Sequence, residues 1–343
     1  MPSNAVTVSA TFTTTSSDPL LVSGGSNGWV NFFRPGSGVP VGYADVGGTI
    51  NSVGIADDGS TAASAGSNGW LNVFRNGVTS PAWYRKVSGV SATSVAVSPD
   101  GSTIVVGSGD GWVNVLSNGG SLMFYAYEGG GISSVAVSGN GQYLVAGDSN
   151  GYVYVWSSSS STPLWSVNVG GAVNTVAMSY DGNWLVVGGS NGGVNYFSRS
   201  SSAVEWYRNV GGSVTSVSIS QDGSVVAVGS SNGWVNAFTG STGANRFYQN
   251  TGSAVNSVSV SRDGSYVAAA SNSGWVNFYS SSSDVPLWYD NTGGSAVSVA
   301  VKTLSSPYGV FVGSSNGWVN YYNTAAPGTP YWYANPGGTL ETA

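Results

Sequence analysis

A five-residue motif recurs along the chain at a nearly constant spacing. It first appears as Asn27-Gly28-Trp29-Val30-Asn31, and seven related copies follow. The glycines of the eight copies stand at positions 28, 69, 111, 151, 192, 233, 274 and 317, so neighbouring copies are 40 to 43 residues apart. A fixed period of this length indicates a repeat architecture in which each unit is one supersecondary element.

Each unit predicts four short antiparallel strands. In unit six, residues 214–220 alternate between apolar and polar side chains, and residues 224–229 form a nearly continuous run of small and β-branched residues. Both patterns are typical of strands, the second of a strand covered on both faces. Asp222-Gly223 and Asn232-Gly233 separate the strands, and an Asn-Gly pair favours a type I′ hairpin turn, in which both central residues need positive φ.

Eight such units predict one all-β domain over residues 1–343, an eight-bladed β-propeller with four antiparallel strands in each blade. The blades are expected at about 5–46, 49–87, 90–127, 131–169, 172–210, 213–250, 254–291 and 295–335, with 336–343 as a tail. Because the chain starts on a first strand and ends after a fourth, no terminal strand exchange is expected. Blades one and eight would then meet through side chains alone, at a seam weaker than the other junctions. Only these two units lack the Asp-Gly or Asn-Gly turn, carrying 13–18 and 303–307 instead.

The residues of these units carry a family resemblance. The stretch 255–264, followed by a Ser-Gly-Trp strand, resembles WD40 repeats, and an aromatic strand entered through Thr162-Pro163 is similar to quinoprotein-like (PQQ-type) repeats. The resemblance covers nearly the whole chain and implies an architecture rather than an activity. The chain departs from WD40 units in having no Gly-His pair, and only Trp156, followed by Ser157, stands where their Trp-Asp pair would end a strand.

The low charge of the chain limits its possible partners and setting. Only 7% of the residues are charged, against about 25% in ordinary soluble proteins, and the net charge is −6. No basic footprint for nucleic acid, no polybasic membrane patch and no apolar run of roughly 18 residues is present, so neither nucleic-acid binding nor direct membrane insertion is expected. A surface this poor in charge favours an extracellular, cell-surface or virion-surface location, with the cytoplasm as the alternative. Residues 1–12 do not read as a signal peptide, so export by that route would need an omitted leader.

Residues for catalysis are scarce. With neither His nor Cys in the chain, imidazole bases, catalytic triads and thiolate nucleophiles are excluded. Most Asp residues stand in predicted turns, and no carboxylate pair faces a common substrate. The quinoprotein resemblance supplies no matching metal-binding carboxylates. Asp148 with neighbouring carbonyls could bind Ca²⁺, but one carboxylate predicts no site. We therefore expect no enzyme activity, no cofactor and no metal.

The recurring Trp and Asn residues of the motif are interpreted as structural. Strand alternation places Trp29 and Asn31 on one face, where the indole would pack between blades and the buried amide would bond neighbouring backbone or a turn. The alternative is a ring of aromatic residues that stack on sugars. The motif residues are Trp29, Asn31, Trp70, Asn72, Trp112, Asn114, Asn195, Asn236, Trp275, Asn277, Trp318 and Asn320.

The motif lapses in units four and five. Tyr152 and Tyr154 replace Trp and Asn in unit four, and Gly193 leaves no side chain where other units place Trp. The missing indole either opens a pocket or is compensated by repacking. A ligand site, if the chain has one, is predicted beside Gly193, Tyr152 and Trp234.

The fourth strands carry paired aromatic residues, and Pro stands two residues before them in five units. An outermost strand is an exposed edge, and Pro blunts its pairing because it has no N–H donor. The aromatic residues of these strands are interpreted as core packing, and the Pro residues as a means of limiting aggregation. The alternative is that the strands form a lateral contact surface. The sequence thus favours a non-enzymatic scaffold that binds other protein subunits, including copies of itself, in a larger assembly. The alternatives are a carbohydrate-binding, lectin-like propeller and a degenerate quinoprotein-like enzyme.

Overall fold

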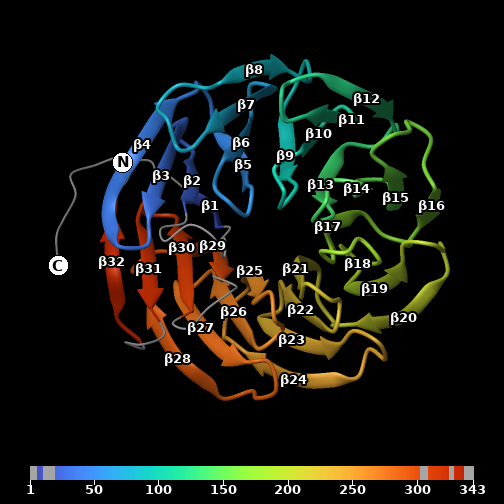
Figure 1. Ribbon diagram of the computed structural model, residues 1–343. Coiled ribbons are helices and arrows are strands. Elements are labelled where there is room, and N and C mark those ends of the chain that lie inside the picture. Colours follow the sequence, from blue (N-terminus) through green and yellow to red (C-terminus); the bar gives the residue numbers. More distant parts are fainter. Residues whose placement is uncertain (1–5, 11–19, 302–307, 324–327, 336–343) are drawn as a thin grey trace.

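The computed structural model describes residues 6–10, 20–301, 308–323 and 328–335, and the side chains of all of these except 6–10. The strands form eight four-stranded antiparallel sheets arranged in a ring (Figure 1). The predicted eight-bladed β-propeller is confirmed. The described residues contain no helix long and apolar enough to cross a membrane.

Each blade is one uninterrupted stretch of sequence. Blades 1 to 4 consist of β1(Val6–Ala10), β2(Leu21–Gly25), β3(Trp29–Arg34) and β4(Ser37–Asp45); β5(Ile50–Ile55), β6(Thr61–Gly66), β7(Trp70–Arg75) and β8(Trp83–Lys86); β9(Ala92–Val97), β10(Thr103–Ser108), β11(Trp112–Ser117) and β12(Leu122–Tyr127); β13(Ile132–Val137), β14(Tyr143–Asp148), β15(Tyr152–Ser157) and β16(Trp165–Asn168). Blades 5 to 8 consist of β17(Val173–Met178), β18(Trp184–Gly189), β19(Gly193–Ser198) and β20(Val204–Asn209); β21(Val214–Ile219), β22(Val225–Ser230), β23(Trp234–Thr239) and β24(Asn245–Asn250); β25(Val255–Val260), β26(Tyr266–Ser271), β27(Trp275–Ser280) and β28(Pro286–Asn291); β29(Ala296–Val301), β30(Gly309–Ser314), β31(Val319–Asn323) and β32(Pro330–Ala334).

The order of strands at the seam confirms the absence of strand exchange. The sheets of blades 1 and 8 run β1-β2-β3-β4 and β29-β30-β31-β32, so neither borrows a strand from the other terminus. Their junction holds an aromatic cluster, in which the rings of Phe33 and Trp332 stack with centroids 5.4 Å apart. The irregular connections at 13–18 and 303–307, and the tail at 336–343, lie outside the described residues. The expectation that the seam is the weakest junction stays a prediction.

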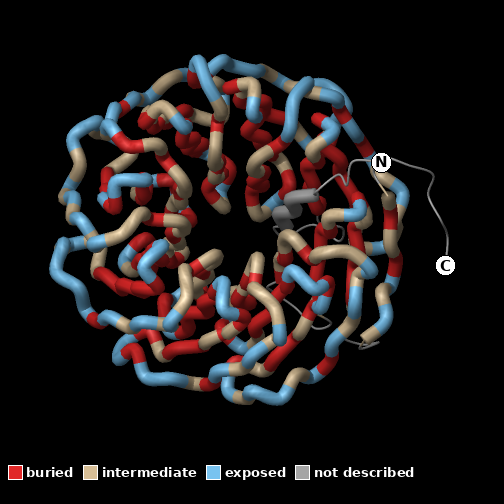
Figure 2. The backbone as a smooth tube through the Cα atoms, turned by 180° about the vertical axis from the view of Figure 1, so that it is seen from behind, coloured by how far each residue is buried: buried red, intermediate tan, exposed pale blue. Residues whose placement is uncertain are grey.

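The core lies between blades rather than within one sheet. The second strands are the most buried, and β6, β10 and β22 are buried at every residue, because a blade in the ring is covered on both faces. Each of the eight hydrophobic clusters draws its residues from two neighbouring blades. Figure 2 shows this gradient, with buried chain inside the ring and exposed chain along its outer edge.

Side-chain oxygens of the innermost strands join one blade to the next. A Ser or Thr hydroxyl near the middle of the first strand accepts a hydrogen bond from a valine N–H on the first strand of the following blade, at 3.1 to 3.3 Å. The pairs, donor first, are Val95–Ser52, Val135–Ser94, Val176–Ser134, Val217–Thr175, Val258–Ser216 and Val299–Ser257. These bonds satisfy N–H groups that the inner edge of each sheet would leave unpaired.

Backbone hydrogen bonds also link successive blades just beyond the first strands. Tyr180 N–H donates to the carbonyl of Gln221, and Gln221 N–H donates to that of Arg262, both at 2.9 Å. In blade 3 the equivalent residue is Pro99, whose carbonyl accepts a hydrogen bond from Asp57 N–H. Because Pro99 has no N–H, the bond to the next blade comes from Asp100 N–H, which donates to the carbonyl of Gly139.

One ion pair spans several blades on the same face. Arg262 of blade 7 pairs with Asp57 of blade 2, and its guanidinium lies 4.1 Å from the ring centroid of Tyr180 in blade 5. Burial raises the pKa of Asp57, and the attraction of Arg262 opposes that rise. The contact ties together blades that are separated in the ring by blades 8 and 1.

The turns between second and third strands differ from the type I′ prediction. Gly28 has φ +86° and its N–H donates to Gly25, but Asn27 does not have positive φ. The side-chain oxygen of Asn27 instead accepts a hydrogen bond from Trp29 N–H, which holds Asn27 in an Asx turn. The glycine alone supplies the left-handed residue, as in hairpins that combine a type I turn with a bulge.

Candidate functional site: grooves at the blade junctions

The motif tryptophans lie at the rim of the propeller, so the expectation that they pack in the core is wrong. Trp29, Trp70, Trp112, Trp234 and Trp318 are half-buried, and Trp275 is 39% exposed. Each indole meets a tyrosine of the fourth strand of its own blade nearly edge-to-face, with centroids 5.3 to 5.6 Å apart and interplanar angles of 52° to 67°. The reason is position along the strand: this residue directly follows the turn, at one end of the blade and next to the outermost strand.

The indoles that pack between blades belong to the fourth strands instead. Trp206, Trp288 and Trp332 are buried, each against the neighbouring blade. Their neighbours in sequence, such as Tyr207 and Tyr289, point outward and are exposed. The indole N–H of Trp206 donates to the carbonyl of Gly240 in the next blade at 2.6 Å. Trp83, Trp165 and Trp332 donate to Asn118, Arg199 and Pro35 in the same way.

The recurring asparagines do not share the backbone hydrogen bond expected of them. The side-chain nitrogen of Asn114 donates to the carbonyl of Val87 at a long 3.4 Å. The side-chain nitrogens of Asn236 and Asn320 are buried and have no hydrogen-bond partner among the described residues. An unpaired buried amide costs about 1–3 kcal/mol. The Ser and Thr hydroxyls of the first strands, rather than these amides, join the blades in register.

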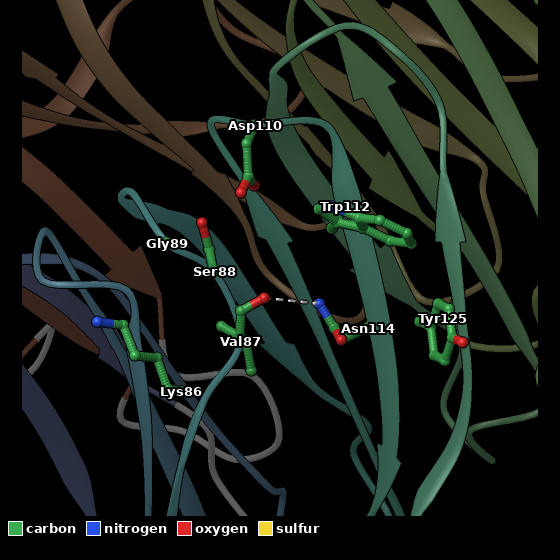
Figure 3. Close-up of a pocket in the computed structure, with 8 residues that line it drawn as sticks. All are labelled: Lys86, Val87, Ser88, Gly89, Asp110, Trp112, Asn114 and Tyr125. Atoms are coloured by element: carbon green, nitrogen blue, oxygen red, sulfur yellow. Dashed lines mark hydrogen bonds between the residues drawn. The ribbon is translucent and has the colours of Figure 1, made fainter.

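Trp, Asn and Tyr line a groove where blade 3 meets blade 2 (Figure 3). Trp112 and Asn114 come from β11 and Tyr125 from β12, whereas residues 86–89 come from the end of β8 and the connection that follows it. The groove encloses about 420 Å³. Figure 3 shows Asn114 reaching across to the carbonyl of Val87, with Trp112 and Tyr125 along one wall.

An equivalent groove lies where blade 7 meets blade 6. Trp275, Asn277 and Tyr289 occupy the same positions as their counterparts in blade 3, and residues 249–251 form the opposite wall. This groove encloses about 270 Å³. The same constellation at two separate junctions shows that the groove is a product of the repeat.

Blade 4 fills the same positions differently. The hydroxyl of Tyr154, which stands in the Asn position, donates to the carbonyl of Glu128 at 3.3 Å and to Asp148 at 3.4 Å. Asp148 is fully buried and also accepts from Tyr152 N–H at 2.7 Å. Its carboxylate is therefore used to hold the turn and the tyrosine. Burial raises the pKa of Glu128, and the nearby Asp148 charge raises it further.

Gly193 in blade 5 leaves space that a neighbour takes. A methyl group added there would lie 3.0 Å from the ring of Tyr207 and 2.9 Å from Asn191 Oδ1. Tyr152, Gly193 and Trp234 begin the third strands of three successive blades, β15, β19 and β23 (Figure 1). Trp234 lines a hollow with residues 245–250 and 282–284, without the other two. The predicted site at these three residues is therefore not brought together as one cluster, and ligand binding beside any of them stays a prediction.

The turn carboxylates are held by hydrogen bonds. Burial opposes ionisation of Asp181, yet bonds from the Ser179 hydroxyl and from Asn183 hold the pKa of Asp181 below its usual range. Hydrogen bonds likewise lower the pKa of Asp222 and of Asp263. No group of three or more His, Cys, Asp or Glu residues that could hold a metal ion occurs in the described part of the chain.

The molecule is therefore an eight-bladed propeller with grooves at two of its blade junctions. The family model described as "WD domain, G-beta repeat" matches residues 86–116, 121–157, 162–198, 207–238 and 244–280, which is just over half of the chain. The chain belongs to the WD40 repeat family. Members typically serve as protein-interaction scaffolds and are usually not enzymes.

Solved structures share the fold at low sequence identity. The computationally designed Ika8 protein superposes with a TM-score of 0.79 at 17% identity, covering 94% of this chain and 96% of that one. Sqt1 of Saccharomyces cerevisiae superposes with a TM-score of 0.78 at 16% identity, covering 95% of this chain and 100% of that one. No curated protein matches the chain in sequence. These likenesses support the fold alone.

Proposed function

We propose that the chain is a non-enzymatic scaffold that binds other protein subunits, including copies of itself, within a larger assembly displayed outside the cell or on a virion. The observation that carries the proposal is the apolar outer edge. Exposed aliphatic side chains stand on or directly before the fourth strands of several blades: Val39, Val41, Leu164, Val204, Val285 and Leu287. Exposed Tyr84, Tyr248 and Tyr331 add aromatic surface along the same edge.

These residues stand on edge strands with free pairing groups. β8, β16 and β28 are hydrogen-bonded to a neighbour on one side only. Apolar side chains beside an unpaired edge favour association, and tyrosine is enriched at protein interfaces. The low charge of the chain, 7%, removes the repulsion that keeps crowded cytosolic proteins apart and supports a setting outside the cell.

Cross-linking of native material followed by mass spectrometry tests the scaffold. We expect cross-links from the outer strands to other subunits, and cross-linked species that disappear when Leu164, Val285 and Leu287 are changed together to Ser. Asn245→Ser, an exposed polar change on β24, is the control and should preserve them. A chain that remains monomeric and forms no cross-links in its native setting contradicts the proposal. Fractionation of the source would test the location, with recovery in the cytoplasm as the contrary result.

A further inference from the structure

Each complete blade junction contains an aromatic corner above an amide. Six blades carry all three residues: Trp29, Asn31 and Tyr43; Trp70, Asn72 and Tyr84; Trp112, Asn114 and Tyr125; Trp234, Asn236 and Tyr248; Trp275, Asn277 and Tyr289; Trp318, Asn320 and Tyr333. Trp and Tyr meet at angles of 52° to 67° in all six. At Trp275 and Tyr289 both rings keep exposed area, and both line the blade 7 groove.

The amide of this corner lacks a hydrogen-bond partner for its nitrogen in two blades. Asn320 is 7% exposed, and its side-chain nitrogen has no hydrogen-bond partner among the described residues. Asn236 is half-buried as a residue, and its side-chain nitrogen is likewise buried without a partner among the described residues. At the junction shown in Figure 3, Asn114 has only the 3.4 Å bond to Val87. A groove amide that makes only a long protein hydrogen bond, as Asn114 does, can gain free energy when a ligand hydroxyl offers a better acceptor.

The other wall is polar and nearly uncharged. Residues 249–251 (Gln, Asn, Thr) line it at the blade 7 groove, and Ser88 lines it at the blade 3 groove, where Lys86 and Asp110 supply one charge of each sign. Volumes of about 270 and 420 Å³ suit a compact ligand rather than an extended one, near the lower end of ordinary ligand pockets. An apolar ring face, an amide and neutral hydroxyl or amide groups together match a pyranose, which has one C–H face and hydroxyls around its edge.

We propose that the two blade-junction grooves bind neutral sugars, one pyranose unit in the groove of blade 3 and one in the groove of blade 7, with the C–H face on Trp or Tyr and a hydroxyl on the Asn amide. Two grooves on one chain make the binding bivalent. Weak individual sites then give strong binding to a surface that carries many copies of the sugar, by about 10²- to 10⁴-fold over a single site where the spacing allows simultaneous contact. Blades 4 and 5, which lack the motif, contribute no site.

A printed array of neutral hexose, deoxyhexose and N-acetylhexosamine oligosaccharides tests the proposal directly. The chain should bind at least one of these classes, and the corresponding free methyl glycoside should change tryptophan fluorescence and compete with array binding. Trp112→Ala with Trp275→Ala should lower array binding at least 10-fold. Asn114→Leu with Asn277→Leu should do the same with an unchanged melting temperature, which separates loss of the site from loss of the fold.

One further variant gives the test its control. Val285→Ser lies on the rim outside the grooves and should leave sugar binding unchanged. No binding to any neutral sugar on the array, or binding that survives both paired groove variants, overturns the proposal. Binding of a peptide library that depends on Trp112 and Trp275, in the absence of sugar binding, overturns it as well.

The test is independent of the scaffold proposal. Groove variants should lose sugar binding and keep cross-links to other subunits, whereas the Leu164, Val285 and Leu287 variant should do the reverse. Failure of one proposal therefore leaves a distinct signature from failure of the other.

Discussion

Blades 4 and 7 place a tryptophan at opposite ends of the same strand. In blade 7 the third strand begins with Trp275, which is 39% exposed at the rim, and Tyr279 lies buried near its end. In blade 4 the strand begins with exposed Tyr152, and Trp156 is fully buried near its end. The comparison shows that position along the strand, and not residue type, decides whether an indole serves the core or the groove.

The largest expected difference concerns these two indoles. Trp156→Ala should lower the free energy of unfolding by about 3–5 kcal/mol, because it empties a fully buried site. Trp275→Ala should cost about 1 kcal/mol, mainly through loss of the contact with Tyr289. Urea denaturation of the two variants measures both values. Equal losses of unfolding free energy in the two variants would contradict the view that position along the strand decides the role of the indole.

The next prediction concerns the third residue of the third strand, which is Tyr154 in blade 4 and Asn236 in blade 6. Tyr154→Phe should destabilise blade 4 by about 1 kcal/mol, because the carbonyl of Glu128 and the carboxylate of Asp148 lose a shared donor. Asn236→Leu in blade 6 should leave stability unchanged or raise it slightly, because it removes an unpaired amide. Thermal unfolding of both variants tests this, and a clear loss of stability in Asn236→Leu would restore the structural role first predicted for the asparagine.

The smallest effect is the dependence of stability on pH that Glu128 contributes, in the connection between blades 3 and 4. The pKa of Glu128 is raised in the folded chain, so folding favours its neutral form. The stability that Glu128 contributes is present below its unfolded pKa, about 4.5, and is lost as pH rises through the folded pKa. Glu128→Gln should therefore raise the melting temperature slightly at pH 7 and have no such benefit at pH 4. A gain of the same size at both values would contradict this origin.

Hydrogen exchange at the seam is a separate test of the ring. If the junction of blades 1 and 8 is the weakest, amides of these blades should exchange faster than those of blades 3 to 5. The opposite order would show that the aromatic cluster of Phe33 and Trp332 closes the ring as firmly as the other junctions.

The repeat alone was enough to predict the fold, the number of blades and the absence of strand exchange, because a period near forty with four strand signals admits few architectures. The burial of Trp275 was predicted wrongly. Strand alternation tells which face of the sheet a side chain occupies, but not whether the residue lies in the middle of the blade or at its exposed end. The hydroxyls of Ser94 and Ser216 were also missed as links between blades, because serine in a strand reads as a solvent-facing residue. A recurring Ser or Thr before the valine of each first strand was the available signal.

The backbone bonds that run from Asp57 to Arg262 join blades 2 to 7 in one series, and they have a mechanical consequence. They lie along the ring, across the direction in which a blade would be pulled outward. A load applied to the outer strand of one of these blades would be shared with the blades on either side, through peptide groups whose geometry does not depend on side-chain identity.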